Sequence, residues 1–281
     1  MNKIKKMLHS RTDKKLNKIQ QDLLLSSLSK DNVWFYSQMK SGTTYTINFL
    51  INYFSLQSKQ EYNIELIKSK LSFFHSTHQV IKHVSPSKII SEQGSILKEY
   101  DFSLIVHTHE NIIDYSKQRI LMTRNPLDYI TSSYFFHYKN RGSHKSIHQL
   151  WKKLADPYIK NHQAQMKILS EQPETTLLIK YECLIKKPEQ VFHKLLSFLN
   201  VDVNNDILLK SIDLSSKKSV KKMESLTGKA IIASPEKFKG SSFIRSGKVG
   251  DWKEHMDTKL SNKILDYLEV NGVNKENFNC N

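Results

Sequence analysis

The chain has 281 residues, of which 38% are hydrophobic and 10% aromatic, and its formal net charge is +16. This composition supplies enough apolar surface for a folded core and excludes a disordered protein. The lysines are scattered along the chain, so the positive charge does not by itself indicate nucleic-acid binding; it suits a phosphorylated nucleotide equally well.

The densest basic stretch is Met1–Lys18. We interpret it as part of a basic helical extension over residues 1–30, followed by a single domain over residues 31–281. Contact of this extension with anionic lipid is kept as an alternative. No apolar run reaches the length of a membrane span, and the patch at Leu23–Leu28 is too short for a secretory signal.

The two cysteines, Cys183 and Cys280, are far apart and belong to no metal-binding motif. We therefore expect neither a zinc site nor a disulfide, which favours a reducing compartment and a cytoplasmic protein. No group of acidic residues suits Mg²⁺, so we expect no metal.

The first predicted strand is the apolar run Val33–Tyr36. It is followed by Lys40-Ser41-Gly42-Thr43-Thr44, after which an apolar segment of helical length begins. A strand, a turn of small residues and a helix together direct backbone N–H groups and the positive end of a helix dipole at an anion. Lys40 adds a full charge and the hydroxyl groups add donors. The stretch therefore predicts a phosphate-binding loop.

Two other interpretations of this loop compete with a phosphate-binding role. An ATP-binding P-loop requires Lys directly after its second Gly, whereas here Lys40 precedes Gly42 by two residues. A simple Ser/Thr-rich helix cap beside an unrelated lysine also fits this stretch when it is taken alone.

Three further apolar runs predict strands. Phe102–Val106 ends in His107-Thr-His109, and Arg119–Thr123 ends in Arg124-Asn125-Pro126, where a helix that contains Ser132 begins. Thr176–Ile179 ends at Tyr181. Functional side chains gather at the carboxyl ends of strands in open α/β sheets. Two histidines directly after a strand therefore favour a functional role at that strand end. The spacing of Arg124 and Ser132 fits either a shared anion or a purely structural role.

Helical patterns cover Ile147–Ser170, the segment from Pro188 to Leu199, and Leu260–Leu268. A Lys-rich stretch at Lys217–Lys222 precedes a loop. Strands that alternate with helices predict a P-loop-like three-layer α/β fold, with a mostly parallel sheet of about five strands and helices on both faces.

Separated segments of this chain resemble, in order, the motifs of the cytosolic-type sulfotransferases, which use 3′-phosphoadenosine 5′-phosphosulfate (PAPS) as donor. KSGTT resembles their 5′-phosphosulfate loop, and HTH resembles the K-T-H strand end that carries a catalytic histidine. RNPLDYITSSY resembles their 3′-phosphate motif, and FIRSGKVGDWK resembles the loop that closes over the nucleotide. YECLIKKPEQVFHKLLSFL resembles a conserved helix of the family. These segments cover most of the chain.

The resemblance implies in-line transfer of a sulfuryl group from PAPS to a small acceptor with a hydroxyl or amine, leaving PAP. It implies His109 as the base and Lys40 as the cation at the leaving oxygen. The implied nucleotide-binding residues are Lys40, Ser41, Gly42, Thr43 and Thr44 at the 5′-phosphate, Tyr45 and Tyr181 at the adenine, and Arg124, Ser132, Arg245, Ser246 and Gly247 at the 3′-phosphate. A histidine suits proton transfer near neutral pH, and a lysine stabilises the departing phosphate oxygen.

The chain departs from the family pattern at four positions in or beside the matching motifs. Met39 replaces a proline before the loop lysine, and Tyr45 replaces an adenine-stacking tryptophan. His107 and Ser246 each replace a lysine. Two alternatives are therefore kept: a P-loop-like nucleotide kinase, and a catalytically silent relative that binds PAP or RNA. Nucleic acid is not expected to be a partner of the enzyme.

Overall fold

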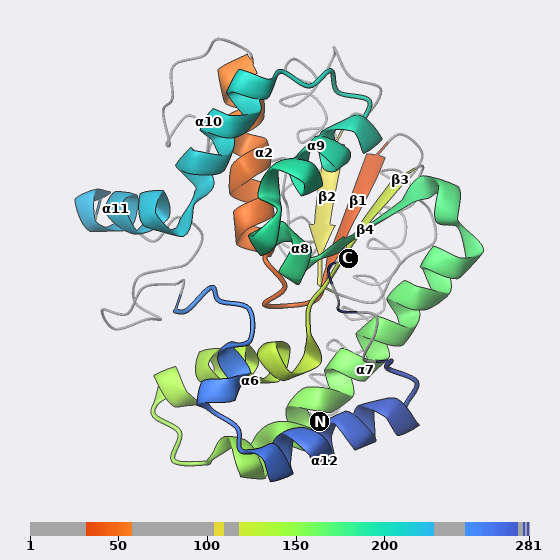
Figure 1. Cartoon of the computed structure of the whole chain (residues 1–281), viewed down its shortest axis with the longest axis vertical. Helices are drawn as coiled ribbons and strands as arrows, with labels where there is room; N and C mark the ends of the chain where they lie inside the picture. Colours follow the sequence, from red (N-terminus) through yellow and green to blue (C-terminus); the bar gives the residue numbers. More distant parts are fainter. Residues whose placement is uncertain are drawn as a thin grey trace, which may run out of the picture.

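The structure is a computed structural model that describes residues 32–57, 104–109, 118–227, 245–274, 278 and 280. Within these residues it has one sheet of four parallel strands, in the order β2-β1-β3-β4 (Figure 1). The strands are β1 (Asn32–Ser37), β2 (Leu104–Thr108), β3 (Gln118–Thr123) and β4 (Thr176–Lys180). All four predicted strands are confirmed, with ends that differ from the prediction by a few residues.

The central strands are continuous apolar runs because both faces of the sheet are covered. Val33, Trp34, Phe35 and Tyr36 of β1 are each at most 2% exposed. Parallel sheets are usually buried on both faces, so such strands lack the polar alternation of a half-exposed strand. The predicted α/β fold with a parallel sheet between helices is therefore confirmed.

One face of the sheet is covered by α2 (Thr43–Gln57), α9 (Pro188–Phe198) and α10 (Asn205–Ser215). Their apolar side chains join those of the strands in one core, in which the rings of Phe49 and Phe192 stack with centroids 3.7 Å apart. The short helix α8 (Tyr181–Lys186) connects β4 to α9, and α11 (Lys217–Thr227) follows α10 (Figure 1).

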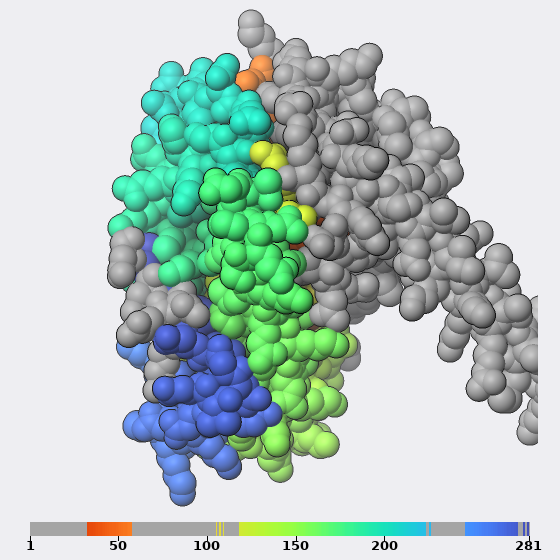
Figure 2. Space-filling view, turned by 90° about the vertical axis from the view of Figure 1, so that its right-hand side faces the viewer, coloured from red at the N-terminus to blue at the C-terminus, as the bar shows by residue number. Residues whose placement is uncertain are grey.

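A second core lies among α6 (Pro126–His137), α7 (Ile147–Glu171) and α12 (Thr258–Val270), beside the short 3₁₀ helix η5 (Asp251–Glu254). Further 3₁₀ turns are η2 (Lys139–Arg141) and η3 (Pro173–Thr175). Helix α7 also reaches the sheet, because the Gln165 side chain donates to the Met122 carbonyl at 3.2 Å. Figure 2 shows α7 (green) along one face of the molecule, with α12 (blue) beside its lower part.

The structure adds two helices to the sequence assignment: α8 begins directly after β4, and the Lys-rich stretch at Lys217–Lys222 lies in α11. One expectation is wrong. Cys183 and Cys280 form a disulfide across a sequence separation of 97, although we expected none. The inference of a reducing compartment from unpaired thiols therefore loses its support.

The predicted N-terminal extension over residues 1–30 lies outside the described residues. The division into that extension and a single domain stays a prediction. Among the helices that the structure describes, none is both long and apolar enough to cross a membrane.

Candidate functional site

The loop between β1 and α2, residues 38–42, has an irregular backbone that the sequence explains. Lys40 and Gly42 both have positive φ, 66° and 98°. A Cβ at Gly42 would lie 2.8 Å from Cδ2 of Tyr181, so only glycine fits against that ring. Ser41 is buried, and both its N–H and its hydroxyl donate to the Gln38 carbonyl. Its hydroxyl therefore closes the turn, and its contact with a nucleotide stays a prediction.

Helix α2 begins directly after this loop, at Thr43. The first N–H groups of a helix have no partner within it, and together with the helix dipole they attract an anion. The first side chain of the helix, Thr43, donates from Oγ1 to Ser37 Oγ at 2.7 Å. The predicted geometry of a strand, a turn and a helix N-terminus is therefore present.

The Lys40 side chain lies among other cations. Desolvation, together with the charges of Arg124 and Arg245, lowers the pKa of Lys40 to about 8. Its ammonium nitrogen lies 4.1 Å from the ring centroid of Phe136 on α6. Three positive side chains from separate parts of the chain thus converge, which is favourable when an anion binds between them.

Two histidines lie at the end of β2, next to this cation group. His109 is exposed, and its Nδ1 lies 2.8 Å from the Ser37 carbonyl oxygen. His107 is buried, and its Nε2 lies 2.8 Å from Ser37 Oγ. Desolvation lowers the pKa of His109, the Ser37 carbonyl raises it, and the Lys40 charge lowers it. The Lys40 charge acts on His109, so the two residues predicted to be catalytic lie near one another.

Arg124 connects the loop of residues 38–42 to a distant part of the chain. Its guanidinium donates to the Lys40 carbonyl at 2.9 Å and to the Lys248 carbonyl at 3.2 Å. The same group lies 4.1 Å from the ring centroid of Tyr181. The next residue, Asn125, caps α6, since its side chain accepts from the Leu127 amide at 3.0 Å. The Arg124-Asn125-Pro126 motif thus begins helix α6 and also positions the Arg124 guanidinium.

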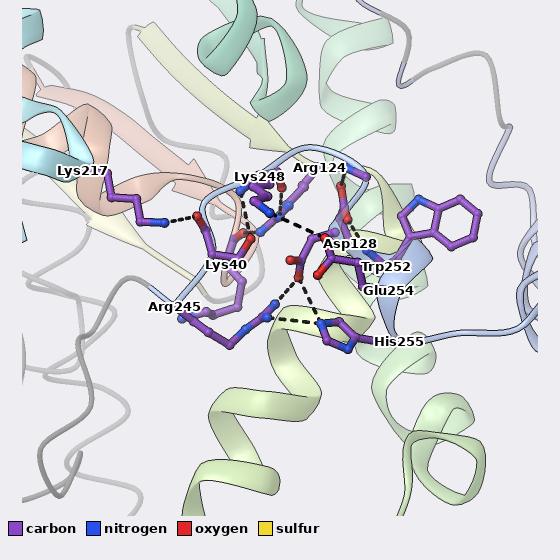
Figure 3. Close-up of polar contacts among 12 residues, drawn as sticks. Lys40, Arg124, Asp128, Lys217, Arg245, Lys248, Trp252, Glu254 and His255 are labelled. Atoms are coloured by element: carbon purple, nitrogen blue, oxygen red, sulfur yellow. Dashed lines mark hydrogen bonds and ion pairs between the residues drawn. The ribbon is translucent and has the colours of Figure 1, made fainter.

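Residues 245–254, which we call the closing segment, are attached to α6 by a buried carboxylate. Asp128 accepts from the amides of Gly250 at 2.7 Å and Trp252 at 3.0 Å. Figure 3 shows this segment crossing α6, with Arg245 and His255 turned toward one another. Arg245 also forms an ion pair with Asp251 and stacks on the ring of Phe135.

A lysine from α11 reaches the closing segment. Lys217 donates to the Ser246 carbonyl, as Figure 3 shows. Desolvation lowers the pKa of Lys217, and the charges of Lys221 and Lys248 contribute to the same shift. A cation from another element therefore lies next to position 246, where the resembling family has a lysine.

Other predicted site residues fall into three groups. Tyr181 is buried between Gly42 and Arg124, which places it in the site. Tyr45 instead packs against the core, with its ring centroid 5.2 Å from that of Phe192. Ser132 lies in the middle of α6, Thr44 lies in the first turn of α2, and Gly247 lies in the closing segment. Their contacts with a nucleotide stay predictions.

Sequence reasoning did not assign roles to several residues of the site. Asp128 belongs to the quoted RNPLD motif, and a carboxylate in an apolar helix is a signal that could have identified it. Glu182 is also buried, and its carboxylate accepts from the Asn125 amide at 2.8 Å. Ser37 and Phe136 carried no such signal, because their importance depends on neighbours distant in sequence.

One group of possible metal ligands occurs within the described residues, at Asp251, Glu254 and His255. Asp251 already pairs with the guanidinium of Arg245, and Glu254 pairs with Lys248 at 3.5 Å. Ion pairing with these cations accounts for the group.

Solved structures with a similar fold include retinol dehydratase in complex with retinol and PAP. Its TM-score is 0.59 at 17% identity, over 88% of this chain and 83% of that chain. A mouse sulfotransferase complexed with PAP gives a TM-score of 0.58 at 19% identity, over 90% of this chain and 89% of that chain.

Sequence comparisons agree with this likeness of fold. Cytosolic sulfotransferases 17 and 16 of Arabidopsis thaliana are each 23% identical to this chain over 175 residues, 57% of its length. The chain spans about half the length of these curated relatives, 51% and 52%. The family described as "Sulfotransferase domain" matches residues 30–276. The chain therefore belongs to the sulfotransferase domain family.

Proposed function

We propose that this protein transfers a sulfuryl group from PAPS to a hydroxyl group, or an amine, of a small acceptor. The observation that carries the proposal is the convergence of Lys40, Arg124 and Arg245 beside His109. The cations come from the loop after β1, the end of β3 and the closing segment. Such a cluster suits a donor with several phosphate charges, and the histidine suits a proton transfer.

The residues present fit the donor in two further respects. Gly42 leaves the backbone of the 38–42 loop free of a side chain next to the α2 N-terminus, where a phosphate oxygen meets free amides. The buried Nε of Arg124 has no hydrogen-bond partner among the described residues, so a donor remains available for an anion. PAP is bound in the retinol dehydratase and mouse sulfotransferase structures.

In the proposed reaction His109 accepts the proton of the acceptor hydroxyl as its oxygen forms a bond to sulfur. The bond between sulfur and the bridging phosphate oxygen breaks, and the leaving PAP retains the electron pair. Lys40 stabilises the negative charge that grows on that oxygen. Arg124 and Arg245 hold the nucleotide, and Tyr181 lies beside Arg124 where an adenine ring can contact it. By analogy with the cytosolic sulfotransferases, we place this activity in the cytoplasm.

The test is release of PAP when the protein is incubated with PAPS and a panel of alcohols, phenols and amines. We expect turnover with at least one acceptor class. His109→Ala should lower kcat by roughly 10²–10⁴-fold while the Kd for PAP stays nearly unchanged. His193→Ala, at an exposed histidine on α9, is the matched control and should keep wild-type kcat.

Two outcomes would contradict the proposal. Tight binding of PAP or RNA without turnover on any acceptor would indicate a silent binding protein. Turnover that requires Mg²⁺ and ATP would indicate a kinase. Near-normal kcat in His109→Ala would remove His109 from the role of the base.

A further inference from the structure

A chain of hydrogen-bonded polar groups lies beneath His109, and the proposed reaction leaves it without a role. Ser37, the last residue of β1, is 3% exposed, and His107 of β2 is 6% exposed. β1 and β2 are parallel neighbours, and Phe35 lies opposite His107. Ser37 follows Phe35 by two residues, so the side chains of Ser37 and His107 meet at the same edge of the sheet. Buried polar groups next to a reactive side chain commonly fix its orientation and tautomer.

The backbone determines which nitrogen of His109 carries the proton. Nδ1 lies 2.8 Å from the Ser37 carbonyl oxygen, which can only accept a hydrogen bond. Nδ1 must therefore be protonated. In the neutral ring the second nitrogen, Nε2, then has a lone pair, which is the group that a base requires.

The hydroxyl of Ser37 determines the state of His107 in the same way. Thr43 donates its hydroxyl proton to Ser37 Oγ at 2.7 Å. Ser37 Oγ has two acceptor positions, which the Thr43 hydroxyl and the Nδ1–H of His109 occupy. Its contact with Nε2 of His107 at 2.8 Å is then a donation of its own single proton. His107 is then a neutral acceptor with its proton on Nδ1. Burial lowers the pKa of His107 to about 3, and the nearby His109 contributes, which agrees with a neutral ring at physiological pH.

The two imidazole rings are in contact, with centroids 4.5 Å apart and planes at 89°. Ser37 Oγ also lies 3.1 Å from Nδ1 of His109, so this N–H is shared between the carbonyl and the hydroxyl of one residue. A charged His107 would repel the proton that His109 accepts, whereas a neutral His107 leaves His109 free to become charged.

We propose that Ser37 and His107 are positioning residues that hold His109 in the Nδ1–H tautomer, with Nε2 available as the base. This inference rests on the proposed function, in which His109 accepts a proton. The resembling family has a lysine where this chain has His107. The proposal gives His107 a different role from that lysine, because a neutral imidazole accepts a hydrogen bond and does not attract phosphate. Ser37 and His107 do not themselves touch the reacting atoms.

The first experiment measures the tautomers directly by NMR on the full-length protein with ¹⁵N-labelled histidine rings. We expect a protonated Nδ1 and an unprotonated Nε2 for both His107 and His109 at pH 7, assigned with His107→Phe and His109→Asn. A proton on Nε2 of His109, or a mixture of tautomers in that ring, would overturn the proposal. This readout does not depend on sulfuryl transfer.

The second experiment compares Ser37→Ala with Ser37→Thr, which keeps a hydroxyl, and His107→Phe with His107→Gln, which keeps an acceptor. We expect Ser37→Ala and His107→Phe to lower kcat by about 3- to 10-fold, as for one lost hydrogen bond, with an unchanged Kd for PAP. Both should lower the fraction of the Nδ1–H tautomer at His109 without abolishing it, because the Ser37 carbonyl still accepts that proton while the hydroxyl contact is lost or reversed. Ser37→Thr and His107→Gln should restore the wild-type fraction.

A purely structural role would lower the melting temperature and leave the His109 tautomer and kcat unchanged, which would overturn the proposal. A loss of PAP affinity at unchanged kcat would overturn it too, since His107 would then be a nucleotide contact. If His109→Ala retains full turnover, the base assignment in the proposed function fails, while the NMR result still decides the tautomer separately.

Discussion

The loop of residues 38–42 and the closing segment face the same site but are held in different ways. The turn of the loop is formed by its own residues, through positive φ angles at Lys40 and Gly42 and the bonds of Ser41 to Gln38, while Arg124 and Tyr181 contact it from outside. The closing segment is held by a side chain more than a hundred residues away, Asp128. A locally encoded loop supports rigid catalytic geometry, whereas a segment held by distant contacts can be released by changing one carboxylate.

This difference predicts that changes in one region lower kcat and changes in the other lower nucleotide affinity. Changes at the 38–42 loop should act on kcat, because Lys40 is needed most when charge develops on the leaving oxygen. Changes at the closing segment and its attachments should act on nucleotide affinity.

The largest effect is expected for Lys40→Ala. It should lower kcat by roughly 10²–10³-fold, the loss typical for one group that stabilises a developing oxyanion, with a smaller change in the Kd for PAP. Steady-state kinetics and equilibrium binding measure the two quantities. Lys167→Ala, at an exposed lysine paired with Glu171 on α7, is the control and should change neither. A larger loss of affinity than of kcat would contradict the division between the two regions.

Arg124 touches both regions, through the carbonyls of Lys40 and Lys248. We expect Arg124→Ala to weaken PAP binding by about 1.5–3 kcal/mol, the usual contribution of a hydrogen bond to a charged group. Arg124→Lys should fall between this variant and the wild type, because lysine keeps the charge and loses the planar fork. Titration calorimetry with PAP measures these differences.

The assignment of Arg124 to the 3′-phosphate has a separate test, which compares two ligands of the wild-type protein. Adenosine 5′-phosphosulfate lacks the 3′-phosphate and should bind the wild type more weakly than PAPS. Equal affinities for the two compounds would show that Arg124 serves another part of the ligand.

The expected pH dependence of the activity follows from the lowered pKa values of Lys40 and His109. The pKa of Lys40 is lowered to about 8, so kcat/KM for PAPS should fall about tenfold per pH unit above that value as the ammonium loses its proton. A bound nucleotide adds negative charge and raises this pKa, so the basic limb of kcat should lie at higher pH. On the acid side, activity should be lost through a pKa below the ordinary 6.5 of histidine, because the pKa of His109 is lowered. A basic limb that persists in Lys40→Ala would assign it to another group.

The smallest of these effects is expected for Asp128→Asn. An amide retains one acceptor for the two backbone N–H groups that Asp128 binds, so the closing segment should loosen and PAP should bind about 5- to 10-fold more weakly. Limited proteolysis after Lys248 and Lys253 should be faster in the variant, and PAP should slow it in the wild type. Asp156→Asn, at an exposed carboxylate bonded to Tyr267, is the matched control. Identical cleavage of Asp128→Asn and wild type would show that Asp128 does not hold the segment.

The sequence by itself determined the four strands, the loop after β1 and the helix that begins at Pro126. These features depend on local physics: apolar runs, glycine at a positive φ, and proline in the first turn of a helix. Because parallel strands end at one edge of the sheet, the same reasoning also predicted that His109, Arg124 and Tyr181 follow strand ends.

Only the tertiary structure decided which of these residues meet, and through which atoms. The Cys183–Cys280 disulfide, the contact of Lys217 with Ser246 and the attachment of the closing segment to Asp128 all join residues far apart in sequence. The neutral state of His107 depends on burial and on one proton of Ser37, neither of which leaves a pattern in the sequence. Hydrogen-bond direction and desolvation depend on packing in three dimensions, so the fold must form before they are defined.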